Sequence, residues 1–166
     1  MLIYMATVLE LCESLRLREI SPELEPQELV HRCLYGTPDF VTWLENELPG
    51  YASDPVNIDM SPLEQVAVVF HAYVVGLPFS TDRRFKKLSW TPQHHIWEIK
   101  TDDIRIFGWI PRRDAFICCF GDLKSEIEIF RKYGLYIART KYVRENMNLD
   151  EPKCVEGKDY NDVISN

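Results

Sequence analysis

Several features that mark large classes of proteins are missing from this sequence of 166 residues. No apolar run approaches the roughly 18 residues that a membrane-spanning helix needs. The first ten residues lack the basic residues of a secretory signal, because the first basic residue is Arg16. The five cysteines are scattered and odd in number, unlike a disulfide framework. We therefore expect a cytoplasmic protein with no membrane partner.

Signatures of common enzyme classes are also missing. The sequence contains no glycine-rich phosphate loop, no G-x-S-x-G nucleophile elbow and no H-E-x-x-H zinc motif. The pairs His94-His95 and Cys118-Cys119 are adjacent in sequence, so their side chains would point to opposite sides of an extended chain. No further ligand lies at a recognised metal-binding spacing from them. We therefore expect no metal ion and no other cofactor.

The composition is that of one globular domain, with 46% hydrophobic, 12% aromatic and 27% charged residues. The net charge of −7 is unevenly distributed, with −8 in residues 1–60, +4 in residues 61–149 and −3 in residues 150–166. This distribution has two readings. Either the acidic residues form an ordinary solvated surface, or the basic middle segment binds an anionic partner that the acidic segments help to shield.

The three charge segments also differ in their expected structure. Residues 1–60 are expected to form an acidic, helical N-terminal extension, with one helix over Gln27–Tyr35 and another that begins after Thr37. Residues 61–149 form the expected core. It opens with a helix that Ser61 and Glu64 start as a capping box and that Gly76 ends. Residues 150–166 are expected to be a polar tail with little to bury.

Three strand-like runs follow one another in the core, at Ile96–Lys100, Ile104–Ile110 and Ala115–Phe120. Tight turns at Asp102-Asp103 and Arg112-Arg113 would join them as two-residue hairpins. The sequence therefore predicts an α+β fold in which helices pack on a small antiparallel β-meander.

In this register one face of the meander is apolar, and the other places Lys100 directly opposite Arg105. Two neighbouring cations are unfavourable unless an anion lies nearby. The remaining side chains expected on that second face are Glu98, Phe107, Trp109, Phe116 and Phe120. Cations together with aromatic rings suit RNA, because phosphates pair with the cations and unpaired bases stack on the rings. The alternative is a sheet that helices bury on both faces, with Glu98 neutralising the cations.

A second basic cluster precedes the meander, in a segment that we expect to be a loop. Arg83, Arg84, Lys86 and Lys87 are accompanied there by a single acid, Asp82. The cluster either contacts a nucleic-acid backbone or is an ordinary solvated run of charge. Further basic candidates for nucleic-acid contacts are Arg112, Arg113 and Lys124.

The order of these elements resembles the RelE/HigB-like toxin superfamily. The resemblance covers roughly residues 62–130 and depends on a lysine–leucine pair before the first strand and on short strings in the first two strands. The matching residues are Lys87, Leu88, Trp97, Glu98, Ile99, Lys100, Ile104, Arg105, Ile106 and Phe107. In that superfamily a helical region precedes an antiparallel sheet of three or four strands.

The resemblance implies the toxin of a type II toxin–antitoxin module, with a cognate antitoxin protein as partner. Many such toxins cut mRNA on the ribosome without a metal ion, by attack of the RNA 2′-hydroxyl on the adjacent phosphate. Carried over by position, Arg105 would bind the scissile phosphate, Lys100 would lie beside it, and Lys87 would stabilise charge or assist proton transfer. The alternatives are a non-catalytic binding protein with the same fold and a toxin directed at DNA gyrase.

Overall fold

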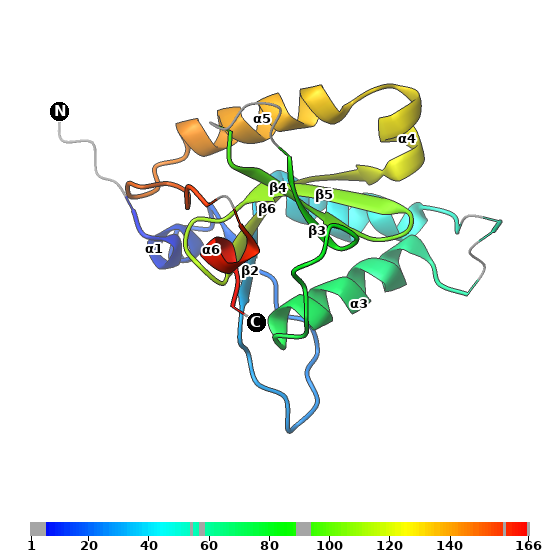
Figure 1. Ribbon diagram of the computed structural model, residues 1–166, viewed down its shortest axis with the longest axis horizontal. Helices are drawn as coiled ribbons and strands as arrows, with labels where there is room; N and C mark the ends of the chain where they lie inside the picture. Colours follow the sequence, from blue (N-terminus) through cyan, green and yellow to red (C-terminus); the bar gives the residue numbers. More distant parts are fainter. Residues whose placement is uncertain (1–5, 54, 57–58, 89–93, 158, 166) are drawn as a thin grey trace.

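The computed structural model describes residues 6–53, 55–56, 59–88, 94–157 and 159–165. Helices cover both faces of one six-stranded sheet (Figure 1), which confirms the α+β fold class. The strands lie in the order β1-β2-β6-β5-β4-β3. Their bounds are Arg18–Glu19 (β1), Cys33–Gly36 (β2), Phe85–Leu88 (β3), Ile96–Lys100 (β4), Ile104–Trp109 (β5) and Ala115–Leu123 (β6).

Strands β3 to β6 form an antiparallel meander, of which the sequence predicted the last three strands. The first hairpin has the predicted register, with Lys100 opposite Arg105. The register predicted for the second hairpin is wrong, because Trp109 already pairs with Ile117 near the turn and the pairing of β5 with β6 shifts by one further residue between Phe107 and Gly108. Beyond this β-bulge Arg105 lies opposite Asp122, which supplies an anion beside the two neighbouring cations.

The shifted register also exchanges the two faces of β6 before the bulge, whereas Phe120 lies opposite Phe107 on the predicted face. Phe116 and Cys118 pack in the cluster that contains Trp97 and Ile106. Ala115, Ile117 and Cys119 instead pack with Trp109 on the opposite face. The prediction that Phe116 shares a face with Lys100 and Arg105 is therefore wrong, since one extra residue reverses the alternation of every side chain before it.

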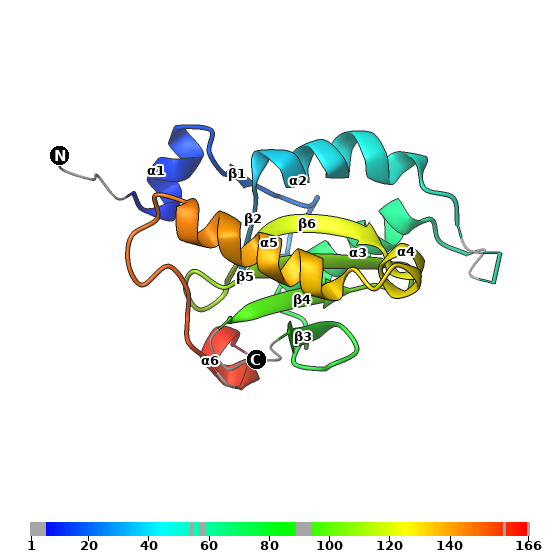
Figure 2. The ribbon, with the colours of Figure 1, turned by 90° about the horizontal axis from the view of Figure 1, so that it is seen from above.

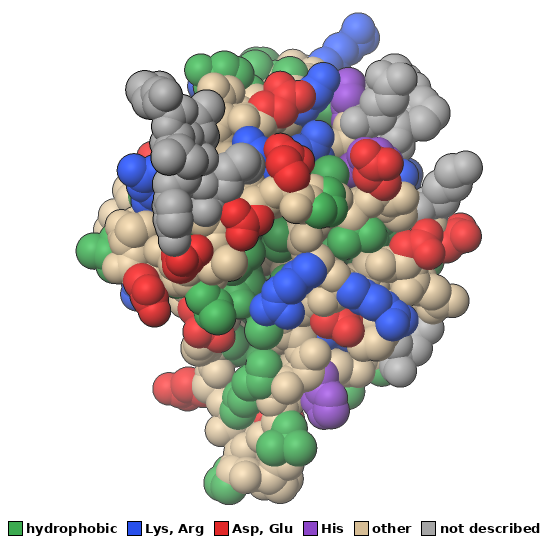
Figure 3. Space-filling view, turned by 90° about the vertical axis from the view of Figure 1, so that its left-hand side faces the viewer, with side chains coloured by type: hydrophobic (Ala, Val, Ile, Leu, Met, Phe, Trp, Pro, Cys, Tyr) green, Lys and Arg blue, Asp and Glu red, His purple; other side chains and the backbone are tan. Residues whose placement is uncertain are grey.

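The N-terminal third is part of the sheet rather than a helical extension of it. The helix expected over Gln27–Tyr35 is wrong, because this stretch contains strand β2, which pairs in parallel with β6. Before it, helix α1 spans Val8–Glu13. The loop between β1 and β2 projects from the body of the protein (Figures 1 and 3), and Leu29 and Val30 in it are exposed.

Helix α3 (Pro62–Val74) covers one face of the sheet and has the predicted start. The Ser61 hydroxyl accepts a hydrogen bond from the backbone of Glu64, and the Glu64 carboxylate accepts one from the backbone of Ser61. Helix α2 (Pro38–Thr42) begins at the predicted cap, Thr37, and continues as a π-helical turn (Trp43–Glu47) and a 3₁₀ turn (Leu48–Gly50). Together with the sheet these helices enclose the largest apolar cluster.

The opposite face is covered by helices α4 (Lys124–Ile129) and α5 (Tyr133–Asn146), and α5 runs across the strands (Figure 2). The buried and half-buried side chains of α5 recur every three or four residues. They are Tyr133, Tyr136, Ile137, Thr140, Lys141, Val143 and Arg144. The first two of these pack their rings near Phe107. Helices therefore cover both faces of the sheet, which is the alternative to an RNA-binding face that the sequence left open.

The segment expected to be a polar tail buries apolar side chains. It contains the short helix α6 (Tyr160–Val163), and the side chains of Val163 and Ile164 are fully buried in the largest cluster. Arg32, which is 1% exposed, donates hydrogen bonds to the backbone carbonyls of Tyr73, Leu77 and Ser165. This buried guanidinium thus connects the start of β2, the end of α3 and the end of the described chain.

Candidate functional site

One pocket collects most of the basic residues that the sequence singled out on the strands. It has a volume of about 480 Å³ and lies between β3, β4, β5 and the helices α4 and α5. Its lining consists of Lys86, Lys87, Leu88, Glu98, Lys100, Arg105, Glu128 and Tyr133. The three residues predicted to act in catalysis, Lys87, Lys100 and Arg105, are all among them.

The pairing of strand β3 with β4 determines which lysine side chain points into this pocket. The sequence predicted a loop here, but Phe85–Leu88 pairs with β4, so successive side chains alternate between the two faces. Lys87 shares its face with Phe85, and its ammonium donates to the carbonyl oxygen of Gly157 at 2.6 Å. Lys86 is exposed, lies opposite Glu98 and shares the face of Lys100 and Arg105. The lysine that faces the other two cations is therefore Lys86.

Arg105 is held in one position by the hairpin that carries it. Its side chain is largely buried, and one of its terminal nitrogens donates to the carbonyl oxygens of Thr101 and Ile104. Its Nε is buried and has no hydrogen-bond partner among the described residues. Since the carbonyls fix the guanidinium, the cation is oriented before any ligand arrives.

Lys100 lies at the boundary between two pockets. Its ammonium donates to the carbonyl oxygen of Asp82 at 2.9 Å, and burial lowers its pKa while nearby Glu98 raises it. A second pocket, of about 280 Å³, lies on the other side of this lysine. Arg83 and Arg84 line that second pocket together with Gln65 of α3, and they do not line the first one.

The titratable side chains of the pocket that the sequence had not proposed as functional are Glu98, Glu128 and Tyr133. Burial raises the pKa of the Glu98 carboxyl, whereas Arg105, Lys100 and Lys86 lower it. Burial and the nearby Glu98 raise the pKa of the Tyr133 hydroxyl, whereas Arg105 lowers it. Strand alternation placed Glu98 beside Lys100, which was a usable signal, but no sequence pattern indicated that Tyr133 covers this site.

The expected aromatic platform is not available to a nucleic acid. Phe107 and Trp109 are both fully buried. The Phe107 ring stacks on that of Tyr136 with centroids 4.8 Å apart, and the indole nitrogen of Trp109 donates to the carbonyl oxygen of Lys153. Their proposed role in stacking on bases is therefore wrong, because α5 and the segments that flank it occupy the surface that bases would need.

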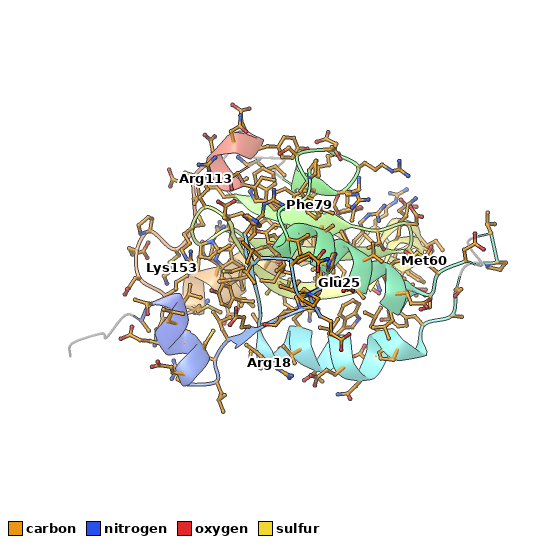
Figure 4. The ribbon with its side chains drawn as sticks, turned by 90° about the horizontal axis from the view of Figure 1, so that it is seen from below. Arg18, Glu25, Met60, Phe79, Arg113 and Lys153 are labelled. Atoms are coloured by element: carbon orange, nitrogen blue, oxygen red, sulfur yellow. The ribbon has the colours of Figure 1, made fainter. Side chains whose placement is uncertain are left out.

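The remaining basic candidates lie outside the pocket. Arg112 and Arg113 are in the turn after β5, at the opposite end of that strand from Arg105. Figure 4 shows Arg113 and Met60, which lines the second pocket, toward opposite ends of the molecule. Lys124 lies 4.0 Å from the carboxylate of Glu128, which lines the first pocket.

The described segments contain neither a metal-binding group of side chains nor a helix that could span a membrane. Within residues 6–53, 55–56, 59–88, 94–157 and 159–165, no three or more His, Cys, Asp and Glu side chains are grouped so that they could hold a metal ion. The helices of those same segments include none with the length and apolar character needed to cross a membrane.

The comparisons with known proteins give no family for this chain. No protein-family model matches it, and neither does any curated protein or any solved structure. The residues of the pocket are therefore the basis for assigning a function.

Proposed function

We propose that this protein is a RelE/HigB-type toxin, a metal-independent endoribonuclease that acts on mRNA at the pocket between β3, β4, β5 and α5. The observation that supports this proposal is the convergence of Lys86, Lys100 and Arg105 on one pocket. The arrangement of α3 followed by four consecutive antiparallel strands agrees with the order that the resemblance implies.

The chemistry needs placed cations more than a strong nucleophile. When the 2′-hydroxyl attacks the adjacent phosphorus, negative charge builds up on the phosphate oxygens. Preoriented donors that face this charge stabilise the transition state more than the ground state. The fixed guanidinium of Arg105 provides a planar donor, and the Lys86 and Lys100 ammonium groups provide point charges.

A second candidate function is a binding protein that holds an anionic partner without cleaving it. It is favoured by the hydrogen bonds that already engage Arg105 and Lys100, and by the burial of Phe107 and Trp109. Both candidates use the same cations, so cleavage is the property that separates them. As a toxin, the protein would also bind a cognate antitoxin protein.

The test is cleavage of single-stranded RNA by the purified protein, with and without ribosomes. We expect products that end in a 2′,3′-cyclic phosphate and a 5′-hydroxyl, no cleavage of DNA of the same sequence, and no effect of a chelator. Lys100→Ala should reduce the cleavage rate about 100-fold or more, the usual effect of removing one charge-stabilising donor.

The matched control is Arg113→Ala, which removes an exposed cation at the far end of β5 and should leave the cleavage rate unchanged. Expression of the wild-type protein without a partner should arrest bacterial growth. A folded protein that binds RNA but leaves it intact under both conditions would replace the nuclease proposal with the second candidate.

A further inference from the structure

Glu98 is an unusual feature of the pocket, because a buried carboxylate lies where a phosphate would bind. The residue is 2% exposed, and its Oε2 atom has no hydrogen-bond partner among the described residues. Leaving a buried polar atom without a hydrogen-bond partner destabilises the folded protein, and the effect is larger if the group is charged. A side chain that carries this cost at a pocket wall is a candidate for a role in binding.

The groups that face Glu98 come from every element around the pocket. Lys86 on β3 lies opposite it, Lys100 is on its own strand, and Arg105 is on β5. Helix α4 contributes Glu128 and helix α5 contributes Tyr133. Three cations therefore surround two carboxylates, of which only Glu98 is buried.

We propose that the pocket binds an RNA phosphodiester together with a proton, and that Glu98 is the group that takes up this proton. The inference depends on the proposed function for the identity of the ligand, but it does not require that the RNA be cleaved.

The coupling follows from competition for the same cations. In the empty pocket Lys86, Lys100 and Arg105 favour the ionised form of Glu98, against the effect of burial on its pKa. A bound phosphodiester brings a second negative charge to these cations and repels the carboxylate, so the pKa of Glu98 rises further. A proton from solvent then adds to the carboxylate, and the neutral carboxyl group can donate a hydrogen bond to a phosphate oxygen. In this step the O–H bond of the carboxyl group forms as the proton leaves a hydronium ion or a buffer acid, and no bond to phosphorus forms or breaks.

The sign of the pH dependence follows from this uptake. Because the complex holds more protons than the free protein, affinity for the phosphodiester falls as pH rises from the pKa of Glu98 in the free protein to its higher pKa in the complex. For a single proton the limit is about tenfold in affinity per pH unit. Above the higher pKa both states are ionised and the affinity becomes constant.

The experiment is calorimetric titration of the full chain with a short 2′-O-methyl oligoribonucleotide, which cannot undergo attack by a 2′-hydroxyl. Titrations in two buffers of different ionisation enthalpy, repeated across pH, count the protons taken up on binding. We expect uptake that approaches about one proton within the window between the two pKa values. Glu98→Gln should abolish the uptake, make the affinity independent of pH, and strengthen binding at high pH.

The matched control is Glu145→Gln, which removes an exposed carboxylate of helix α5 outside this pocket and should leave the proton uptake unchanged. Binding without proton uptake by the wild-type protein overturns the inference and leaves the nuclease proposal standing. Proton-linked binding without cleavage of ordinary RNA overturns the nuclease proposal instead. Failure to bind the oligonucleotide overturns both. If Glu98→Gln does not fold, the wild-type titrations in two buffers still show whether binding takes up a proton, and the absence of uptake still overturns the inference.

Discussion

The two faces of strands β4 and β5 differ in what they bury. The face under α3 is apolar throughout, and Trp97, Ile99, Ile104 and Ile106 on it are at most 2% exposed. The face under α5 carries Phe107 at its centre and a charged group at the first hairpin, in which Lys100, Arg105 and Asp122 lie side by side across three strands.

The face under α3 mainly stabilises the fold, whereas the face under α5 is better suited to binding a ligand. Apolar burial stabilises by roughly 25 cal/mol per Å², whereas a buried charge must recover the free energy of its lost hydration. Charged groups gathered under α5 therefore contribute less to stability than the apolar side chains under α3, and perturbed pKa values such as that of Glu98 are typical of functional sites.

The largest loss of stability is expected for a substitution on the apolar face under α3. Trp97→Ala should lower the free energy of unfolding by about 3–5 kcal/mol, because it leaves a cavity and removes the stack on Phe85, whose ring centroid lies 4.6 Å away. Denaturant unfolding followed by circular dichroism measures this loss. Val68→Ala on the exposed side of α3 is the control and should cost much less. A loss below about 1 kcal/mol for Trp97→Ala would contradict the assignment of this face as the main core.

An intermediate loss of stability is expected for a substitution that removes a hydrogen bond between α5 and the charged face of the sheet. The Tyr136 hydroxyl donates to the Asp122 carboxylate at 2.6 Å, so Tyr136→Phe should cost about 1.5–3 kcal/mol while keeping the ring on Phe107. Tyr142→Phe, at an exposed position of the same helix, should change stability by less than about 0.5 kcal/mol. Equal effects of the two variants would show that the bond to Asp122 does not stabilise this helix.

The smallest expected effect is a gradual change of stability with pH, which comes from the titration of Glu98. Because burial raises the pKa of this carboxyl in the folded protein, the folded state binds more protons than the unfolded state above the ordinary pKa of glutamate. Stability should therefore fall as pH rises from that value to the folded-state pKa, by at most about 1.4 kcal/mol per pH unit. Unfolding measured across pH should show this decline in the wild-type protein and lack it in Glu98→Gln. Parallel curves would show that Glu98 does not titrate on folding.

Local signals in the sequence were sufficient for part of the fold. The capping box at Ser61 set the start of α3, and a short polar turn between alternating strands set the register that brings Lys100 opposite Arg105. These features depend on neighbours in sequence. Two of the three cations that share a pocket face, Lys100 and Arg105, followed from that register.

Features that depend on distant segments were missed. Strand β2 was mistaken for a helix because its partner, β6, lies about 80 residues away and no local pattern indicates a parallel pairing. The bulge in β5 and β6 gave no signal either, and it moved Asp122 beside Arg105. The side chains that α5 turns toward the sheet include Tyr133, Thr140 and Arg144, so its covering role was hidden by a weak apolar pattern.

The partly buried hydrogen bond from Arg32 to the carbonyl oxygen of Ser165 joins residues separated by 133 positions. A contact between such distant residues forms only after all the residues between them have been synthesised, and a high proportion of distant contacts slows folding. During synthesis the guanidinium of Arg32 must therefore wait for Ser165 before it can make this bond, and chaperones would have time to engage the nascent segment around Arg32.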